Sequence, residues 1–153
     1  MAIEAPLSKL KKTNLKIYIA ICIGLAIWCA YDGYFNDEWI KKHTDADGNP
    51  EAYLIFNQKA PPFFIGAGVL LGAYLFAMRN KKVIADENEL IISDKEGIPY
   101  DSIQKIDKTL FDSKGYFLIT YKDKDGSEIN RKLSDRTYDN LAAILEHLVA
   151  KIS

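Results

Sequence analysis

The fold class of this chain is decided by one stretch of its sequence, APPFFIGAGVLLGAYLFAM, residues 60–78. These 19 consecutive residues include no Asp, Glu, Lys or Arg. As a helix rising about 1.5 Å per residue, the stretch would be about 28 Å long, close to the hydrocarbon thickness of a bilayer. Pro61 and Pro62 are expected at the start of this helix, where a missing N–H costs little. A buried core helix is the competing interpretation, but small cores seldom contain about 18 apolar residues in a row.

A second uncharged run, residues 17–31, comes earlier in the chain and is only 15 residues long. It reaches spanning length when extended to 15–35, with Lys16 reaching back to one interface. Aromatic side chains crowd the other end, as in the belts found at membrane interfaces. The expected membrane-edge anchors of both spans are Lys16, Trp28, Trp39, Phe63, Phe64, Arg79, Lys81 and Lys82.

A cleaved signal peptide is the alternative interpretation of the first run. The lysines before it resemble the basic region of such a peptide. Cleavage after Ala30 would place Trp28 at the −3 position, where a small residue is required. The sequence therefore favours an uncleaved anchor.

The charges of the chain are segregated, although its averages are those of a neutral soluble domain. It has 20 basic and 21 acidic residues, a net charge of −1, which argues against a nucleic-acid-binding protein. Seven Lys and Arg flank the two runs on their outer sides, and three lie in the connection between them. The positive-inside rule therefore predicts a multi-pass protein of the cytoplasmic (bacterial inner) membrane, with both termini in the cytoplasm.

Small residues mark possible contact faces on both predicted spans. Gly68 and Gly72 form a GxxxG spacing, and Ala20 and Gly24 form a second small-residue pair. These four helix-packing residues are expected either to join the two helices or to contact another subunit, including a second copy of the chain. Cys22 and Cys29 share a helix face and are expected to be packing residues.

The remaining C-terminal part, residues 82–153, has the composition of a small β domain. Short β-prone runs alternate with turn residues such as those at 94–97 and at Asp125-Gly126. An amphipathic helix follows, beginning near Tyr138 with a cap from Ser134 or Asp135. The predicted strands are 82–85, 89–93, 98–100, 104–110, 115–122 and 127–133.

This order of elements resembles that of the bacterial pleckstrin-homology-like domains that follow membrane helices. The residues that carry the resemblance are ELII at 89–92, IPYDSIQKI at 98–106, the hairpin turn and the terminal helix. At 71 residues, 83–153 is short for the seven-strand form, so one strand or more is expected to be missing or to come from elsewhere. Phosphoinositide binding does not carry over, because the first hairpin is acidic and residues 83–153 have 10 basic and 14 acidic side chains.

The expected organisation is α+β: a two-helix transmembrane hairpin followed by a small antiparallel β domain that the terminal helix closes. Its parts are a cytosolic segment 1–14, spans 15–35 and 60–79, an outer loop 36–59 and the cytosolic domain 82–153. The sequence has no nucleophile, metal or phosphate-binding motif, so we expect no enzyme, cofactor or metal. The expected function is a non-catalytic interaction or scaffold protein in the lipid bilayer with a protein partner; the alternatives are an accessory subunit of a membrane complex and a lipid-binding module.

Overall fold

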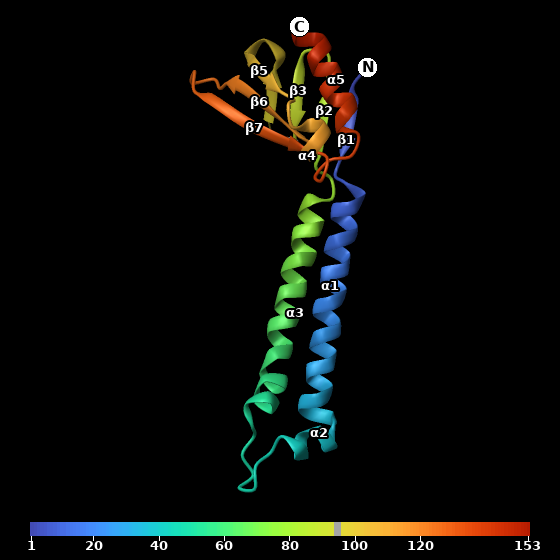
Figure 1. The fold of residues 1–153 in the computed structure, drawn as a ribbon, viewed down its shortest axis with the longest axis vertical. Helices are drawn as coiled ribbons and strands as arrows, with labels where there is room; N and C mark the ends of the chain where they lie inside the picture. The colour runs from blue at the N-terminus through green and yellow to red at the C-terminus, as the bar shows by residue number, and fades with distance from the viewer. Residues whose placement is uncertain (94–95) are drawn as a thin grey trace. The chain divides into compact units, whose positions relative to one another are not determined.

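The computed structural model describes residues 1–93 and 96–153 of the chain, which divides into two compact units. We call the first unit, Met1–Lys12 together with Met78–Ser153, the β domain. The second unit, Thr13–Ala77, is the helical hairpin. The structure is thus α+β, with two long apolar helices and small antiparallel sheets (Figure 1).

The helical hairpin is built from two long helices that lie side by side and a short connecting segment (Figure 1). The first helix runs on into a π-helical turn, so that the helical stretch covers Lys9–Phe35. Asn36 then begins the short third element by accepting a hydrogen bond from the Trp39 amide at 3.3 Å. The elements are α1 (Lys9–Ala30), the π-helix η1 (Tyr31–Phe35), α2 (Asp37–Lys42) and α3 (Ala52–Met78).

The expectation that Pro61 and Pro62 begin the second span is wrong, because α3 begins at Ala52 and includes both prolines. A proline inside a helix leaves the carbonyl four residues earlier without its donor. The freed carbonyls here belong to Asn57 and Gln58, and both lie against η1, as described below. Neighbouring groups of this kind are what make a proline tolerable within an apolar helix.

The first sheet of the β domain contains a strand that was not expected. Strand β1 (Ile3–Pro6) pairs antiparallel with β2 (Lys82–Ala85). Strand β2 pairs antiparallel with β3 (Glu89–Ile92), and β3 with β4 (Glu96–Pro99), so the order in the sheet is β1-β2-β3-β4. The segment 1–14, expected as a separate stretch before the first span, therefore contributes an edge strand. Ala5 and Leu7 are buried in the domain, and the amide of Leu7 extends the pairing to the carbonyl of Lys81 at 3.1 Å.

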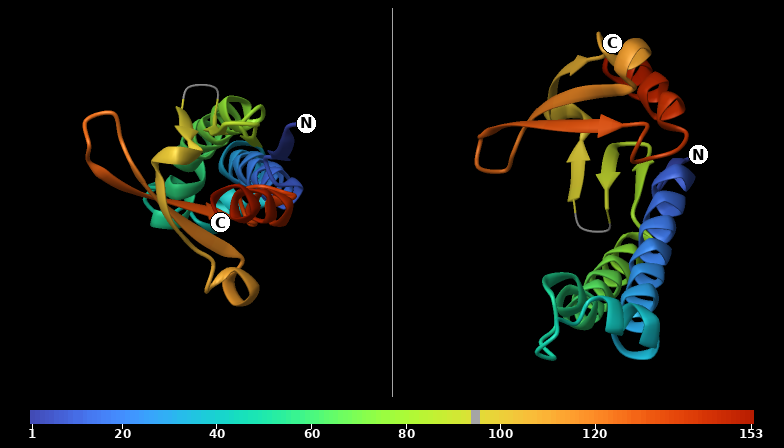
Figure 2. Two further views of the ribbon diagram at one scale, coloured as in Figure 1. Left: turned by 90° about the horizontal axis from the view of Figure 1, so that it is seen from above. Right: turned by 60° about the horizontal axis from the view of Figure 1, so that its bottom comes forward.

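The second sheet has the order β5-β6-β7 and is also antiparallel. Figure 2 shows β6 and β7 extending past the shorter β5. The predicted strand 82–85 is observed with the same bounds, and the other five predicted strands have counterparts with shifted ends. The predicted hairpin turn is confirmed, with Gly126 at φ 80°. Of the predicted turn at 94–97, residues 94 and 95 lie outside the described residues. The strands are β5 (Ile103–Asp107), β6 (Tyr116–Lys122) and β7 (Glu128–Ser134); the short helices are η2 (Tyr100–Ser102) and α4 (Phe111–Lys114).

The terminal helix α5 (Leu141–Ile152) starts later than expected, and the predicted cap at Ser134 or Asp135 is wrong. Residues 137–139 are used instead to extend the edge of β1. The amide of Ser8 donates to the carbonyl of Thr137 at 2.8 Å, and that of Asp139 to the carbonyl of Pro6 at 2.9 Å. The apolar face of α5 joins residues of both sheets in one core, which includes Ala5, Val83, Leu90, Phe117, Ile119, Ile144 and Leu148.

Candidate membrane-spanning surface

The outward faces of α1 and α3 are apolar and exposed. Only 17% of the residues in the most apolar 18-residue window of each helix are buried, so neither is a core helix of the described structure. The exposed fraction reaches 64% for Trp28, 72% for Leu70 and 77% for Phe63. A continuous exposed apolar surface of this kind marks contact with lipid or with another protein. Other exposed members are Ile17, Ile21, Ile23, Ile27, Ile65, Val69 and Phe76.

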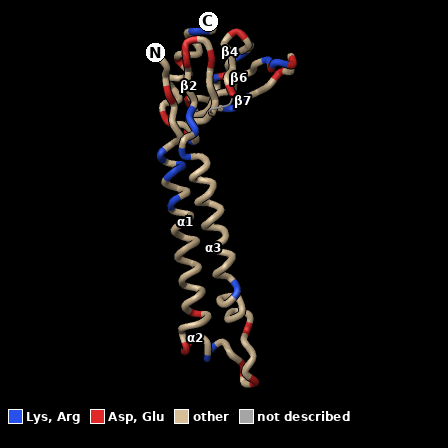
Figure 3. The backbone as a smooth tube through the Cα atoms, turned by 180° about the vertical axis from the view of Figure 1, so that it is seen from behind, with Lys and Arg blue, Asp and Glu red and all other residues tan. Residues whose placement is uncertain are grey.

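The two helices are long and apolar enough to cross a membrane. Each helical stretch, Lys9–Phe35 and Ala52–Met78, has 27 residues, or about 40 Å at 1.5 Å per residue, against about 30 Å of hydrocarbon. Figure 3 shows that the central turns of both helices are free of charged residues, which lie toward the two ends. The length of the two helices, their exposed apolar surface and their uncharged central turns are therefore all compatible with spanning a membrane.

The face on which the two helices meet is lined by small and medium side chains. On α1 the buried residues are Leu15, Ala26 and Cys29, and on α3 they are Leu54, Ala60, Pro61 and Gly68. A Cβ built on Gly68 would lie 3.6 Å from the Cβ of Cys22. Small residues at such positions let helix backbones approach closely, which is how apolar helices associate when lipid removes the hydrophobic driving force.

Of the four predicted helix-packing residues, the structure brings only Gly68 against the other helix. Ala20 and Gly24 are exposed on α1. A Cβ on Gly24 or Gly72 would have no neighbour within 4 Å among the described atoms. The seven-residue spacing of Leu15, Cys22 and Cys29 was the signal in the sequence that could have identified the contact face of α1.

The far end of the hairpin, where η1 meets α3, is held by polar contacts. The hydroxyl of Tyr34 donates to the carbonyl of Gln58 at 2.8 Å, and the side-chain amide of Gln58 donates to the carbonyl of Gly33 at 3.1 Å. A Cβ on Gly33 would lie 2.9 Å from the backbone carbonyl of Asn57. Close approach therefore requires glycine at position 33, and the two helices are joined there by backbone as well as side-chain groups.

The connection beyond η1 is ordered by its own polar side chains. Asp32 is buried and accepts a hydrogen bond from the Asn36 amide group at 2.9 Å. The ring centroid of His43 is 4.2 Å from that of Trp39 and 5.8 Å from that of Tyr53. Its Nδ1 is 3.3 Å from a carboxylate oxygen of Glu51. The following turn is closed by Asp45, whose carboxylate accepts from the amides of Asp47 and Asn49.

The predicted aromatic anchors differ in how far they are exposed. Trp28 on α1 and Phe63 on α3 are exposed, whereas Phe64 is half-buried. Trp39 is half-buried in α2 against His43, and its indole nitrogen is buried without a partner among the described atoms. Trp28 and Phe63 thus belong to the exposed apolar surface, and Trp39 belongs to the connecting segment.

The predicted basic anchors have separate surroundings. Lys16 is exposed on α1, and Arg79 follows the last residue of α3. Lys82 lies within β2, where its Nζ is 2.7 Å from a carboxylate oxygen of Glu4 on β1. Lys81 lines a cleft in the β domain.

No metal-binding group of side chains is assembled in the described part of the chain. Residues 1–93 and 96–153 include no cluster of three His, Cys, Asp or Glu able to hold a metal ion. His147 packs on α5 with its ring 6.2 Å from that of Tyr100, and its Nε2 is buried without a partner among these residues. The two histidines belong to different units of the structure.

Comparison with known proteins adds no relative to this picture. No protein-family model, curated protein or solved structure matches the chain.

Proposed function

We propose that this protein is a two-span integral membrane protein that displays a non-catalytic, pleckstrin-homology-like interaction domain in the cytoplasm of a bacterial cell. The observation that carries the proposal is the exposed apolar surface of two helices that are long enough to cross a bilayer. In water this surface would favour aggregation, whereas lipid is a suitable environment for it.

Pairing between β1 and β2 supports an even number of spans. Strand β1 precedes the hairpin in the sequence and β2 follows it, yet the two are hydrogen-bonded neighbours in register from Ile3↔Ala85 to Pro6↔Lys82. Two strands of one sheet lie on the same side of a membrane, so the chain between them enters and returns. The same pairing argues against a cleaved signal peptide, because cleavage after the first run would remove β1 and uncover Val83 and Ala85.

The strand complement of the β domain supports the pleckstrin-homology-like assignment. With β1 supplied by residues 3–6, the described residues of the domain form seven strands, in sheets of four and three, and a C-terminal helix. Strand β1 thus supplies a strand that residues 83–153 lack. In this arrangement the membrane hairpin is an insertion between the first and second strands of the domain.

Orientation is tested by labelling single cysteines with a membrane-impermeant maleimide, after Cys22 and Cys29 are replaced by Ala. Asn49→Cys, in the exposed connection, is expected to react in intact cells. Lys124→Cys, at the exposed turn between β6 and β7, is expected to react only after permeabilisation. The reverse pattern would overturn the orientation, and a freely soluble protein would overturn the membrane assignment.

A second candidate function is that of an accessory subunit in a larger membrane complex. The exposed small residues Ala20 and Gly24 favour it, because a Cβ on Gly24 would meet no described atom within 4 Å, which leaves room for the backbone of another helix. Native mass spectrometry after mild extraction distinguishes the candidates. A large complex of fixed stoichiometry supports the accessory subunit, and a monomer or weak homo-oligomer supports the interaction protein.

A further inference from the structure

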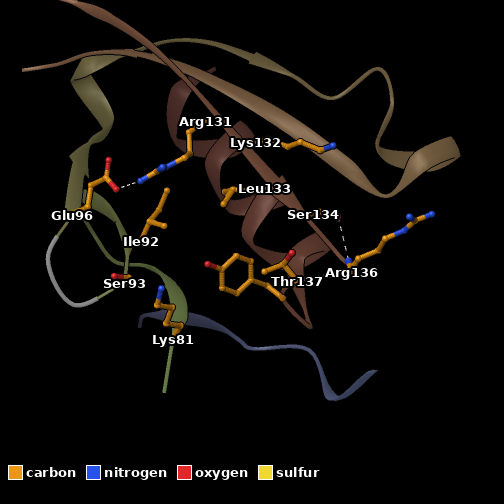
Figure 4. Close-up of a pocket in the computed structure, with 11 residues that line it drawn as sticks. Lys81, Ile92, Ser93, Glu96, Arg131, Lys132, Leu133, Ser134, Arg136 and Thr137 are labelled. Carbon is orange, nitrogen blue, oxygen red and sulfur yellow. Dashed lines mark hydrogen bonds and ion pairs between the residues drawn. The ribbon is translucent and has the colours of Figure 1, made fainter. Parts of the chain in front are cut away.

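A charged cleft of about 510 Å³ opens in the β domain. Its walls come from three places: Lys81 before β2, Ile92 and Ser93 at the end of β3 with Glu96 at the start of β4, and Arg131–Ser134 at the end of β7 with Arg136–Tyr138 after it. Figure 4 shows Arg131 reaching toward Glu96 at one end and Lys81 lying near Ser93 at the other. The cleft is thus formed by segments that are distant in sequence.

Positive charge is concentrated in this cleft against the overall balance of the domain. Residues 83–153 contain 10 basic and 14 acidic side chains. The cleft is lined by four basic residues, Lys81, Arg131, Lys132 and Arg136, and by one described acidic residue, Glu96. Clustered cations in a concave site focus the field and attract anions despite an acidic remainder.

Arg131 is held in place by its neighbours. Its Nη2 donates to one carboxylate oxygen of Glu96, and the other oxygen of Glu96 accepts from the hydroxyl of Tyr121 at 2.8 Å. The Nε of Arg131 is buried and has no partner among the described atoms. The Arg131 side chain as a whole is 40% exposed, so the accessible part of its planar guanidinium can donate to phosphate oxygens with defined geometry.

Hydroxyl groups and further cations complete the lining. Ser93, Ser134, Thr137 and Tyr138 place hydroxyl-bearing side chains along the cleft. Burial raises the pKa of Tyr138, although the charge of Arg131 acts in the opposite direction, so the hydroxyl remains protonated at neutral pH. Lys132 lies at the rim with its Nζ 3.9 Å from the ring centroid of Tyr116, and Arg136 extends outward (Figure 4).

We propose that this cleft binds a phosphate group, and that in the membrane the group is the headgroup phosphate of an anionic phospholipid. Cations together with hydroxyl donors are the chemistry that phosphate oxygens require. The lipid source follows from the chain itself, since Lys81 comes three residues after Met78, the last residue of α3. If α3 spans the bilayer, Lys81 lies at the depth of the headgroups, so this step rests on the proposed membrane insertion.

The test uses the full chain in nanodiscs that contain equal amounts of phosphatidylglycerol and phosphatidylcholine. Native mass spectrometry counts the lipids retained by the wild type, by the Lys81→Gln/Arg131→Gln variant and by a Lys122→Gln/Lys124→Gln control. Both variants lose two positive charges, but the control residues are exposed at the β6–β7 turn. We expect retention of phosphatidylglycerol to fall several-fold in the cleft variant alone. Equal retention in the cleft variant and the wild type, or an equal loss in the control, would overturn the proposal.

A second arm separates a lipid headgroup from a free phosphate. The protein in phosphatidylcholine nanodiscs is titrated calorimetrically with inorganic phosphate. Phosphate binding that requires Lys81 and Arg131, without selective retention of phosphatidylglycerol, would support the cleft but overturn the lipid source. Lys81→Gln alone serves where the double variant fails to fold, because Lys81 is exposed. Failure of the wild type to enter nanodiscs would contradict membrane insertion, which is a different result from an inactive cleft.

Discussion

The hydroxyl of Tyr34 donates a 2.8 Å hydrogen bond to the carbonyl of Gln58, the acceptor that Pro62 leaves without its helical donor. A side chain of η1 thus supplies the hydrogen bond that α3 lacks at this carbonyl. The same region contains a second proline, Pro61, whose orphaned carbonyl at Asn57 lies against Gly33. The carbonyls that the two prolines leave without helical donors therefore contact the π-helical turn η1.

Tyr34→Phe is expected to destabilise the hairpin by about 1 kcal/mol, because the Gln58 carbonyl loses the donor that replaces its helical one. The measurement is unfolding of the full chain in mixed micelles, followed by circular dichroism. In a Pro62→Ala background the new amide can donate to Gln58, so the same substitution should cost little. An equal cost in both backgrounds would show that the hydroxyl does not serve this carbonyl.

Gly33→Ala is expected to lower hairpin stability by about 1–3 kcal/mol, because its Cβ would lie 2.9 Å from the Asn57 backbone and force α3 to shift. Gly24→Ala is the matched control. Its Cβ meets no described atom within 4 Å, and alanine favours the helix, so stability should not fall. Unfolding in the same micelles compares the two, and equal effects would contradict the proposed close approach.

Leu7→Ala is expected to destabilise the β domain by about 2–5 kcal/mol, because Leu7 is 1% exposed and its loss leaves a cavity. Leu10→Ala, at a side chain that is 62% exposed, should have little effect. Limited proteolysis within residues 82–153 provides the measurement. Faster cleavage in the Leu7 variant alone would establish that the N-terminal segment stabilises the C-terminal strands.

Alkaline pH is expected to destabilise the β domain through Tyr100. Burial, with the nearby charges of Asp86 and Glu89, raises the pKa of Tyr100 to about 12 from the ordinary value of 10.0. The neutral form is thus favoured in the folded state, so this contribution to stability is complete below pH 10 and is lost as the pH rises toward 12. Ultraviolet difference titration of wild type against Tyr100→Phe should reveal one tyrosine that ionises near pH 12; ionisation near pH 10 would contradict this.

The predicted structure and the observed one differ where a segment's partner is distant in the chain. The uncharged runs and the six C-terminal strands follow from composition and from local alternation of apolar side chains, which depend on neighbouring residues alone. The role of residues 3–6 was missed, although Ile3, Ala5 and Leu7 alternate with exposed residues as in a strand. A short strand at the N-terminus gives no signal of its partner until the free edge of β2 is known.

Helix boundaries were mispredicted for the same reason. A proline pair is a good signal for a helix start, but η1 supplies contacts that let α3 continue through Pro61 and Pro62. The segment at 134–140 has capping residues, yet its backbone pairs with residues 6–8 and delays α5 until Leu141. In both places a tertiary hydrogen bond replaced the one that a local rule anticipates.

The sequence by itself determined that the chain combines two apolar helices with a small β domain, because a run of uncharged residues or an alternating pattern acts over neighbouring residues. Only the tertiary structure decided that the first strand comes from before the hairpin and that Lys81 and Arg131 line one cleft. The physical reason is that strand pairing and side-chain convergence depend on which backbone edges and charges remain unsatisfied after the local elements have formed.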